Sequence, residues 1–258
     1  MTRTLTTAFS LLLALALPAS QPAYAALMAV EGDARDPDTD RLLYRETHLI
    51  RGEGERLLER IVLYRCPNGT AFARKRVDYR SSSLAPDFEL IDVRGYREGL
   101  RREGSKTLTW SGEGTPTPLR ATNAALVADA GFDEFVRQRW PQLTAGKAQP
   151  LAFAVPAFGR SLPFKIRSAG ARVESGQRVH AFELRVDNLL GMVVSAIRVD
   201  YDADDRRLRR FIGPTNIRDA RGDQIKARID FPQAPQPVDT QRWQAAAQQS
   251  LAVCKLGR

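Results

Sequence analysis

The chain is poor in cysteine and histidine, with two of each among its 258 residues. So few of these side chains leave little material for a metal centre built from histidine and cysteine. The sequences GxSxG, HExxH, SxxK and the Walker pattern do not occur, so the local signatures of common hydrolases and nucleotide enzymes are missing. We therefore predict no metal and no cofactor, and we expect a binding protein more than an enzyme.

Beyond its N-terminus the chain also lacks a hydrophobic run long enough to span a membrane. The longest apolar stretch, residues 189–197, is shorter than the roughly 20 residues that a spanning helix needs. The N-terminus has Arg3, an apolar run over residues 8–18, and small side chains at Ala23 and Ala25, which is typical of a cleaved signal peptide. We predict a signal peptide over residues 1–25, cleavage after Ala25, and release into the periplasm or the medium without a membrane span.

Acidic residues are fewer than basic ones, 30 against 39, and the formal net charge is +9. Without residues 1–25 the chain has 233 residues and a charge of +8, because Arg3 is the only charged residue removed. This length suits one large β domain or two small ones. A basic exported protein can meet an anionic envelope surface, whereas export argues against nucleic acid as a partner. We expect a monomer.

Alternating apolar and polar residues, broken by glycine turns, predict many short strands. Residues 193–231 read as a three-stranded meander, whose last strand alternates cleanly from Ile225 to Phe231. Further strands are expected at residues 43–50, 56–65, 70–80, 88–93, 96–102, 106–110, 151–155, 162–167 and 177–187. We predict a mainly β protein with one large antiparallel sheet over residues 42–231, curled into a half-barrel or open barrel, after a polar leader at residues 26–41. A boundary near residues 112–121, which would make two domains, is the alternative.

An amphipathic helix is expected at residues 129–140, inside the sheet region. Its aromatic side chains recur at helical spacing, and Pro141 is expected to end it. If this helix fills the concave face of the sheet, the aromatic stripe is core; if packing is incomplete, the helix covers an apolar pocket. The side chains expected to line such a pocket are Phe132, Phe135, Trp140, Phe153, Phe164, Phe182, Ile197 and Ile225.

The C-terminal residues 232–258 read as a proline-rich tether followed by a second helix. This helix is expected at residues 240–254, with Asp239 as its N-cap and with Trp243 and Cys254 on the stripe that faces the protein body. In an oxidising compartment an even number of cysteines permits a disulfide. Cys66 and Cys254 are therefore expected to form a bridge or to remain as two buried thiols.

Other polar residues are weighed for chemistry. His48 and His180 lie in predicted strands and are interpreted as core or surface residues. The arginine-rich runs at 74–76, 101–102 and 206–210 are interpreted as solvated strand ends, with contact to anionic head groups as the alternative. Carboxylates that could be paired in an enzyme are Glu46, Glu59, Asp200, Asp202, Asp204 and Asp205. The aspartates of this group cluster in a hairpin turn, where their side chains can bond the backbone. No catalytic residue is assigned.

Residues 199–211 contain V-x-Y-D followed by R-x-L-x-x-F. With this hairpin, an export signal, consecutive strands and an intervening amphipathic helix, the chain resembles the superfamily of periplasmic outer-membrane lipoprotein carriers and receptors and its exported relatives. The resemblance implies a binding protein that holds a lipid or acyl chain between the concave sheet and the helix at 129–140. No functional residue is transferred. A cell-envelope hydrolase or lyase that uses carboxylates, and a structural partner in an envelope complex, stay open as alternatives.

Overall fold

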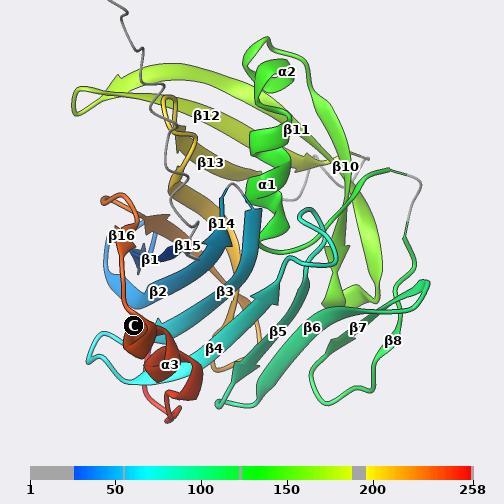
Figure 1. Cartoon of the computed structure of the whole chain (residues 1–258), viewed down its shortest axis with the longest axis vertical. Coiled ribbons are helices and arrows are strands. Elements are labelled where there is room, and N and C mark those ends of the chain that lie inside the picture. The colour runs from blue at the N-terminus through cyan, green and yellow to red at the C-terminus, as the bar shows by residue number, and fades with distance from the viewer. Residues whose placement is uncertain (1–25, 55, 122–123, 188–195, 257–258) are drawn as a thin grey trace, which may run out of the picture.

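The computed structural model describes residues 26–54, 56–121, 124–187 and 196–256. The predicted signal peptide lies outside this range, and so does the start of the predicted meander, before residue 196. In the described part, one sheet of sixteen strands curls around two short helices (Figure 1). The prediction of a mainly β protein with a large, curled antiparallel sheet and a C-terminal helix is confirmed.

The first seven strands form an antiparallel meander, because each pairs with the next along the chain. Their bounds are β1 Ala26–Arg35, β2 Leu42–Glu53, β3 Arg56–Arg65, β4 Ala71–Asp78, β5 Asp87–Asp92, β6 Tyr96–Glu103 and β7 Lys106–Ser111. The turns at Gly69 and Gly95 have φ angles of 89° and 105°, a region that glycine enters without a steric penalty. The sequence marks both turns clearly.

The remaining strands complete the sheet on both sides of the meander. They are β8 Thr117–Pro118, β9 Leu126–Val127, β10 Gln149–Val155, β11 Arg160–Glu174, β12 Gln177–Val186, β13 Ile197–Asp202, β14 Leu208–Arg218, β15 Gln224–Asp230 and β16 Gln236–Pro237. Strand β15 pairs with β1, so the N-terminal strand lies in the middle of the sheet, between β2 and β15.

The expected polar leader at residues 26–41 is therefore wrong for most of its length, because residues 26–35 form β1. Its inward positions hold small residues, Gly32 and Ala34, which give a weak apolar signal. A Cβ atom at Gly32 would lie 2.5 Å from the ring of Phe231, so that ring occupies the space that a side chain would need.

The two ends of the sheet approach each other through the segment that holds residues 117–121 and 124–127. It pairs with β7 through β8, bridges Arg160 through Arg120, and runs parallel to β10 as β9. The Arg120 amide donates to the Gly159 carbonyl at 3.2 Å, and the Ser161 amide donates to the Arg120 carbonyl at 3.0 Å. One stretch of chain thus links both edges of the curl.

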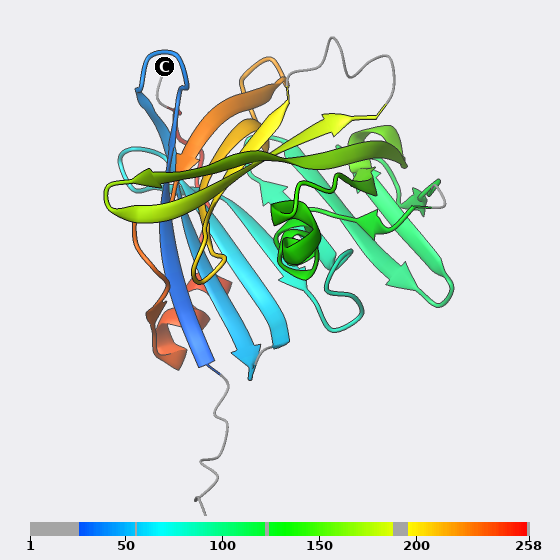
Figure 2. The ribbon, with the colours of Figure 1, turned by 90° about the horizontal axis from the view of Figure 1, so that it is seen from above.

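Two consecutive helices lie between the walls of the curl (Figures 1 and 2): α1 Gly131–Gln138 and α2 Trp140–Thr144. A Cβ atom at Gly131 would collide with the carbonyl oxygen of Leu84, so the start of α1 lies directly against the loop before β5. Pro141 was expected to end the helix but lies in the first turn of α2, where a missing N–H costs nothing. A single 3-10 turn, Pro156–Phe158, connects β10 and β11.

The C-terminal helix α3, Thr240–Gln248, packs on the convex side of β1 to β3 (Figure 2). Its N-cap is Asp239, which accepts a hydrogen bond from the Arg242 amide. The helix ends at Gln248, six residues earlier than expected, and a tail without regular secondary structure continues to Cys254. A disulfide joins Cys254 to Cys66, which follows β3, across 188 positions of sequence.

Candidate functional site

Seven of the eight side chains predicted to line a pocket come together in a core between α1, α2 and strands β10 to β13. Phe135 and Phe182 are 1% and 0% exposed, and Trp140 lies edge-on to Phe182 with 5.4 Å between ring centroids. The eighth residue, Ile225, packs against a different cluster, built around β1 to β5, β14 and β15. The helices and the sheet are therefore in contact along the aromatic stripe.

A cavity of about 100 Å³ lies beside this core, where β1, β2 and β3 approach α1 and the start of β14. We name it the arginine cavity. Its apolar lining residues are Val30, Ile50, Leu208, Phe231 and Pro235. Its polar lining residues are His48, Arg60, Asp133, Arg137, Arg207 and Gln233. None of these residues was predicted to line a pocket, and Arg207 belongs to the arginine-rich run at 206–210.

Asp133, on α1, connects the helix to both walls. Arg60 Nη1 of β3 lies 3.5 Å from Asp133 Oδ2, and the Tyr201 hydroxyl of β13 donates to Asp133 Oδ1 at 2.8 Å. Burial by itself would raise the pKa of Asp133, but Arg137, Arg60 and the Tyr201 hydrogen bond outweigh burial and hold the pKa below its ordinary value. Asp133 therefore stays ionised at neutral pH.

Arg60 is the most buried guanidinium of the cavity, with a side chain only 9% exposed. Burial alone would lower its pKa, but Tyr79, Asp133 and other acidic groups raise the pKa above its ordinary value. Its Nε atom is buried and has no hydrogen-bond partner among the described residues. A guanidinium has five N–H donors, and the Asp133 contact leaves this one unused.

Arg137 and Arg207 complete the cationic lining. Arg137 Nε donates to Glu134 at 3.1 Å, and Arg207 Nε lies 3.1 Å from Asp205. These two carboxylates are not part of the lining, so the cavity itself is lined by three guanidinium groups and one carboxylate. In the described part of the chain, the buried Nη1 atom of Arg207 also lacks a hydrogen-bond partner.

His48 lies beside these arginines and contacts a carboxylate of its own strand. Its Nε2 atom is 2.7 Å from Glu46 Oε2, and the two side chains are 13% and 8% exposed. Phe231 meets the imidazole edge-on, with 5.3 Å between ring centroids. Residues two apart on a strand share a face, so this spacing is the signal in the sequence that could have indicated the pair.

The second histidine belongs to the aromatic core. His180 stacks on Phe182 with 4.7 Å between ring centroids, and its Nε2 atom lies 2.8 Å from Ser168 Oγ. Burial lowers the pKa of His180, so the imidazole is neutral at pH 7.

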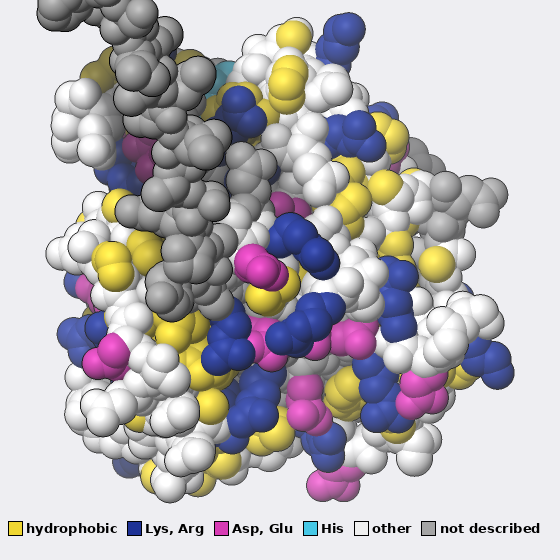
Figure 3. Space-filling model, in the orientation of Figure 1, with side chains coloured by type: hydrophobic (Ala, Val, Ile, Leu, Met, Phe, Trp, Pro, Cys, Tyr) yellow, Lys and Arg dark blue, Asp and Glu magenta, His cyan; other side chains and the backbone are white. Residues whose placement is uncertain are grey.

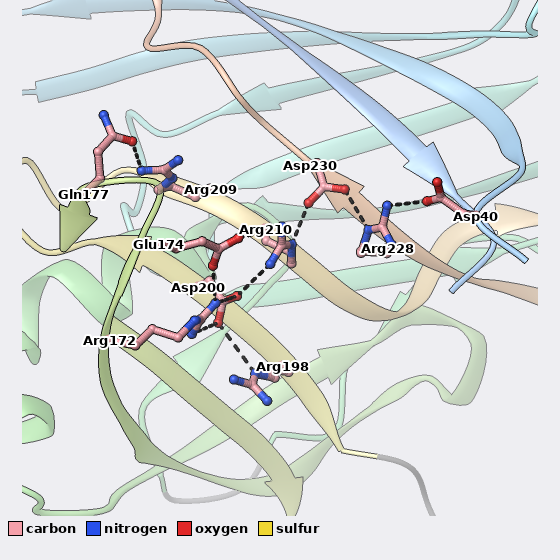
Figure 4. A network of polar contacts seen from close by, with 10 residues as sticks. All are labelled: Asp40, Arg172, Glu174, Gln177, Arg198, Asp200, Arg209, Arg210, Arg228 and Asp230. Atoms are coloured by element: carbon pink, nitrogen blue, oxygen red, sulfur yellow. Dashed lines mark hydrogen bonds and ion pairs between the residues drawn. The ribbon is translucent and has the colours of Figure 1, made fainter. Parts of the chain in front are cut away.

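The acidic hairpin residues form turns and ion pairs. Asp202 Oδ1 accepts the amides of Asp204 and Asp205 at 2.9 Å and 3.4 Å, which is the expected turn chemistry. Asp200, on the same strand, is 4% exposed and lies at the centre of a network of arginines (Figure 4). The closest nitrogen atom of each arginine is Arg172 Nη2 at 2.6 Å, Arg198 Nε at 3.6 Å and Arg210 Nη1 at 3.6 Å.

The basic run at residues 74–76 differs from the predicted solvated strand end. Arg74 Nη1 and Arg76 Nη2 donate to the carbonyls of Gln249 and Ala247, at the end of α3, at 2.9 Å and 2.7 Å. Lys75 points to the other face of β4, where its Nζ atom lies 2.7 Å from Asp129 Oδ1. Because side chains alternate along β4, the two arginines reach the end of α3, whereas the lysine between them points toward the start of α1.

Basic and acidic side chains are interspersed on the face of the molecule shown in Figure 3. Among the described helices, none combines the length and the apolar character that a membrane crossing needs.

No protein-family model matches the sequence, and no curated protein matches it either. Among solved structures, the fold is similar to a crystal structure described as a beta-barrel-like protein of domain of unknown function DUF1849 from Brucella abortus. The two chains are 11% identical, the TM-score is 0.49, and the match covers 83% of this chain and 98% of that chain. The resemblance to lipoprotein carriers stays a prediction.

Replacing Asp133 by asparagine should lower the free energy of unfolding by about 2 kcal/mol near pH 7, because an ionised hydrogen-bond acceptor is lost. A folded-state pKa below the unfolded value means that the carboxylate stabilises the fold above an unfolded pKa of ~3.9. This contribution disappears as the pH falls through the folded-state pKa. Urea unfolding at several pH values should therefore show wild type and variant converging in acid. A difference that stays constant would contradict this assignment.

Proposed function

We propose that this protein is an exported binding protein that holds an amphiphile with an acyl chain on the concave side of its sheet. The observation that carries the proposal is the arginine cavity, in which apolar side chains and guanidinium groups line one space. Small-molecule sites typically combine an apolar lining with a few placed polar groups. The protein makes and breaks no covalent bond of its ligand.

The acyl chain extends from the arginine cavity along α1. The core around Phe135 and Phe182 is filled, so a long chain replaces contacts between α1 and strands β10 to β13. Each methylene group that leaves water contributes about 0.8 kcal/mol, and this gain has to exceed the loss of the core contacts that the chain replaces. Affinity should consequently rise with chain length.

Titration calorimetry and native mass spectrometry with hexanoate, decanoate and dodecanoate test the proposal. The variant Ile50→Trp fills the cavity without adding charge and should weaken dodecanoate binding about ten-fold or more, because the ligand loses apolar contact area. The matched control is Ile91→Trp, at an isoleucine of β5 that is 39% exposed, and it should bind as wild type does. Wild-type protein that binds none of the acids, or equal binding by Ile50→Trp, would reject the proposal.

A further inference from the structure

We infer that the arginine cavity binds the head group of this amphiphile and that the head group is an oxyanion, a carboxylate or a phosphate. The inference rests on the proposed function and adds the chemical class of the ligand. Three guanidinium groups and a histidine line the cavity, against one carboxylate. Guanidinium groups bind carboxylates and phosphates through paired N–H donors, so this lining favours an anion.

The three arginines come from separate elements that the curl brings together. Arg60 lies on β3, Arg137 on α1, and Arg207 in the turn before β14. Each is anchored on one side: Arg60 by Asp133, and the other two by carboxylates outside the lining. Such anchors fix the guanidinium planes before a ligand arrives, which reduces the entropy lost on binding.

Two of the arginines also have unused hydrogen-bond donors. Arg60 Nε and Arg207 Nη1 are buried and without partners among the described residues. The contact of 3.5 Å between Arg60 and Asp133 is at the long end of the hydrogen-bond range, so Asp133 does not saturate this guanidinium. A buried donor without an acceptor is unfavourable, and an oxyanion bound in the cavity brings acceptor oxygens close to these guanidinium groups.

The network around Asp200 provides a contrast within the same fold. There too, arginines converge beside a cavity, of about 130 Å³. Asp200 already occupies the centre of that group and accepts from Arg172, while Arg210 also binds Asp230 at 2.6 Å (Figure 4). In that cluster the carboxylates line the cavity themselves, whereas the carboxylates that pair with Arg137 and Arg207 lie outside the lining of the arginine cavity.

The test compares dodecanoate, dodecyl phosphate and uncharged dodecanol as ligands of the full mature protein. Arg207→Gln removes one guanidinium and should weaken both anions about ten-fold while dodecanol binding stays within about two-fold, because only the charged head loses its donors. The matched control is Arg209→Gln. Arg209 has nearly the same exposure, 17% against 16%, and also approaches Asp202, but it lines the cavity beside Asp200. It should leave all three affinities unchanged.

A second variant, Arg60→Lys, keeps a positive charge beside Asp133 but loses the guanidinium fork. This variant should bind dodecyl phosphate more weakly than the wild type. Its urea unfolding curve checks that the variant is folded. Suppose that dodecanol binds as tightly as dodecanoate and that neither Arg207→Gln nor Arg60→Lys weakens the anions more than the alcohol. The inference is then overturned, and the proposed function stands. If inorganic phosphate competes with dodecyl phosphate at equal affinity while dodecanol fails to bind, the oxyanion site stands and the acyl-chain function is overturned.

Discussion

Replacing both Cys66 and Cys254 by alanine should lower the free energy of unfolding by about 3 to 5 kcal/mol. The bridge joins positions 188 residues apart and closes most of the described chain into one loop. In the chain-entropy description, stabilisation grows with loop length, because the longer loop loses more freedom in the unfolded state. Urea denaturation under oxidising conditions, extrapolated to water, measures the difference.

Reduced wild-type protein is the control, and it should unfold at nearly the same urea concentration as the double variant. The bridge also holds the tail that follows α3, so Trp243 should report the local change. This side chain is 8% exposed and stacks under the Arg51 guanidinium at 4.4 Å. Its fluorescence should shift to the red in the variant before the sheet unfolds. Coincident unfolding of the oxidised protein and the double variant would show that the bridge contributes no stability.

Asp129→Asn should lower the free energy of unfolding by about 3 kcal/mol, because it leaves the Lys75 ammonium buried without its counter-ion. The two side chains are 9% and 3% exposed, with 2.7 Å between Lys75 Nζ and Asp129 Oδ1. Asp129 has a φ angle of 44°, a left-handed conformation that asparagine also tolerates. The substitution therefore changes the charge while the backbone preference and the shape are kept.

The double variant Lys75→Met/Asp129→Asn separates the contribution of the ion pair to stability from that of side-chain packing. Methionine fills similar space without charge, so the double variant should be more stable than Asp129→Asn alone. Thermal and urea unfolding of the wild type, both single variants and the double variant complete the cycle. Additive losses in that cycle would mean that Lys75 and Asp129 do not stabilise each other.

Most of the sheet could be predicted, because its strands alternate between a core face and a second face and are separated by glycine turns. Strand β1 could not, since its inward positions are small where Phe231 packs over Gly32. Strand β14 runs through Gly213 and Pro214 to Arg218, because its later residues still pair with β15. Local turn residues thus indicate a break that tertiary pairing overrides.

The arginine cavity is harder to predict, because its cationic residues are distant in sequence and belong to three elements. Nothing in the local sequence distinguishes Arg60 or Arg207 from other arginines, and their proximity follows from the register of the sheet and the position of α1. The aromatic stripe was visible, but sequence alone left open whether it was core or pocket. The spacing of Glu46 and His48 was the one local signal at this site.

The position of β1 between β2 and β15 has a consequence for the order in which the chain folds. During synthesis β1 can pair with β2 at once, but its other edge has no partner until β15 is made, almost 190 residues later. Contacts of such sequence separation are slow to form, and an unpaired strand edge is prone to pair with other chains. The middle of the finished sheet is therefore an edge in the nascent chain, and the last strands to emerge cover the first.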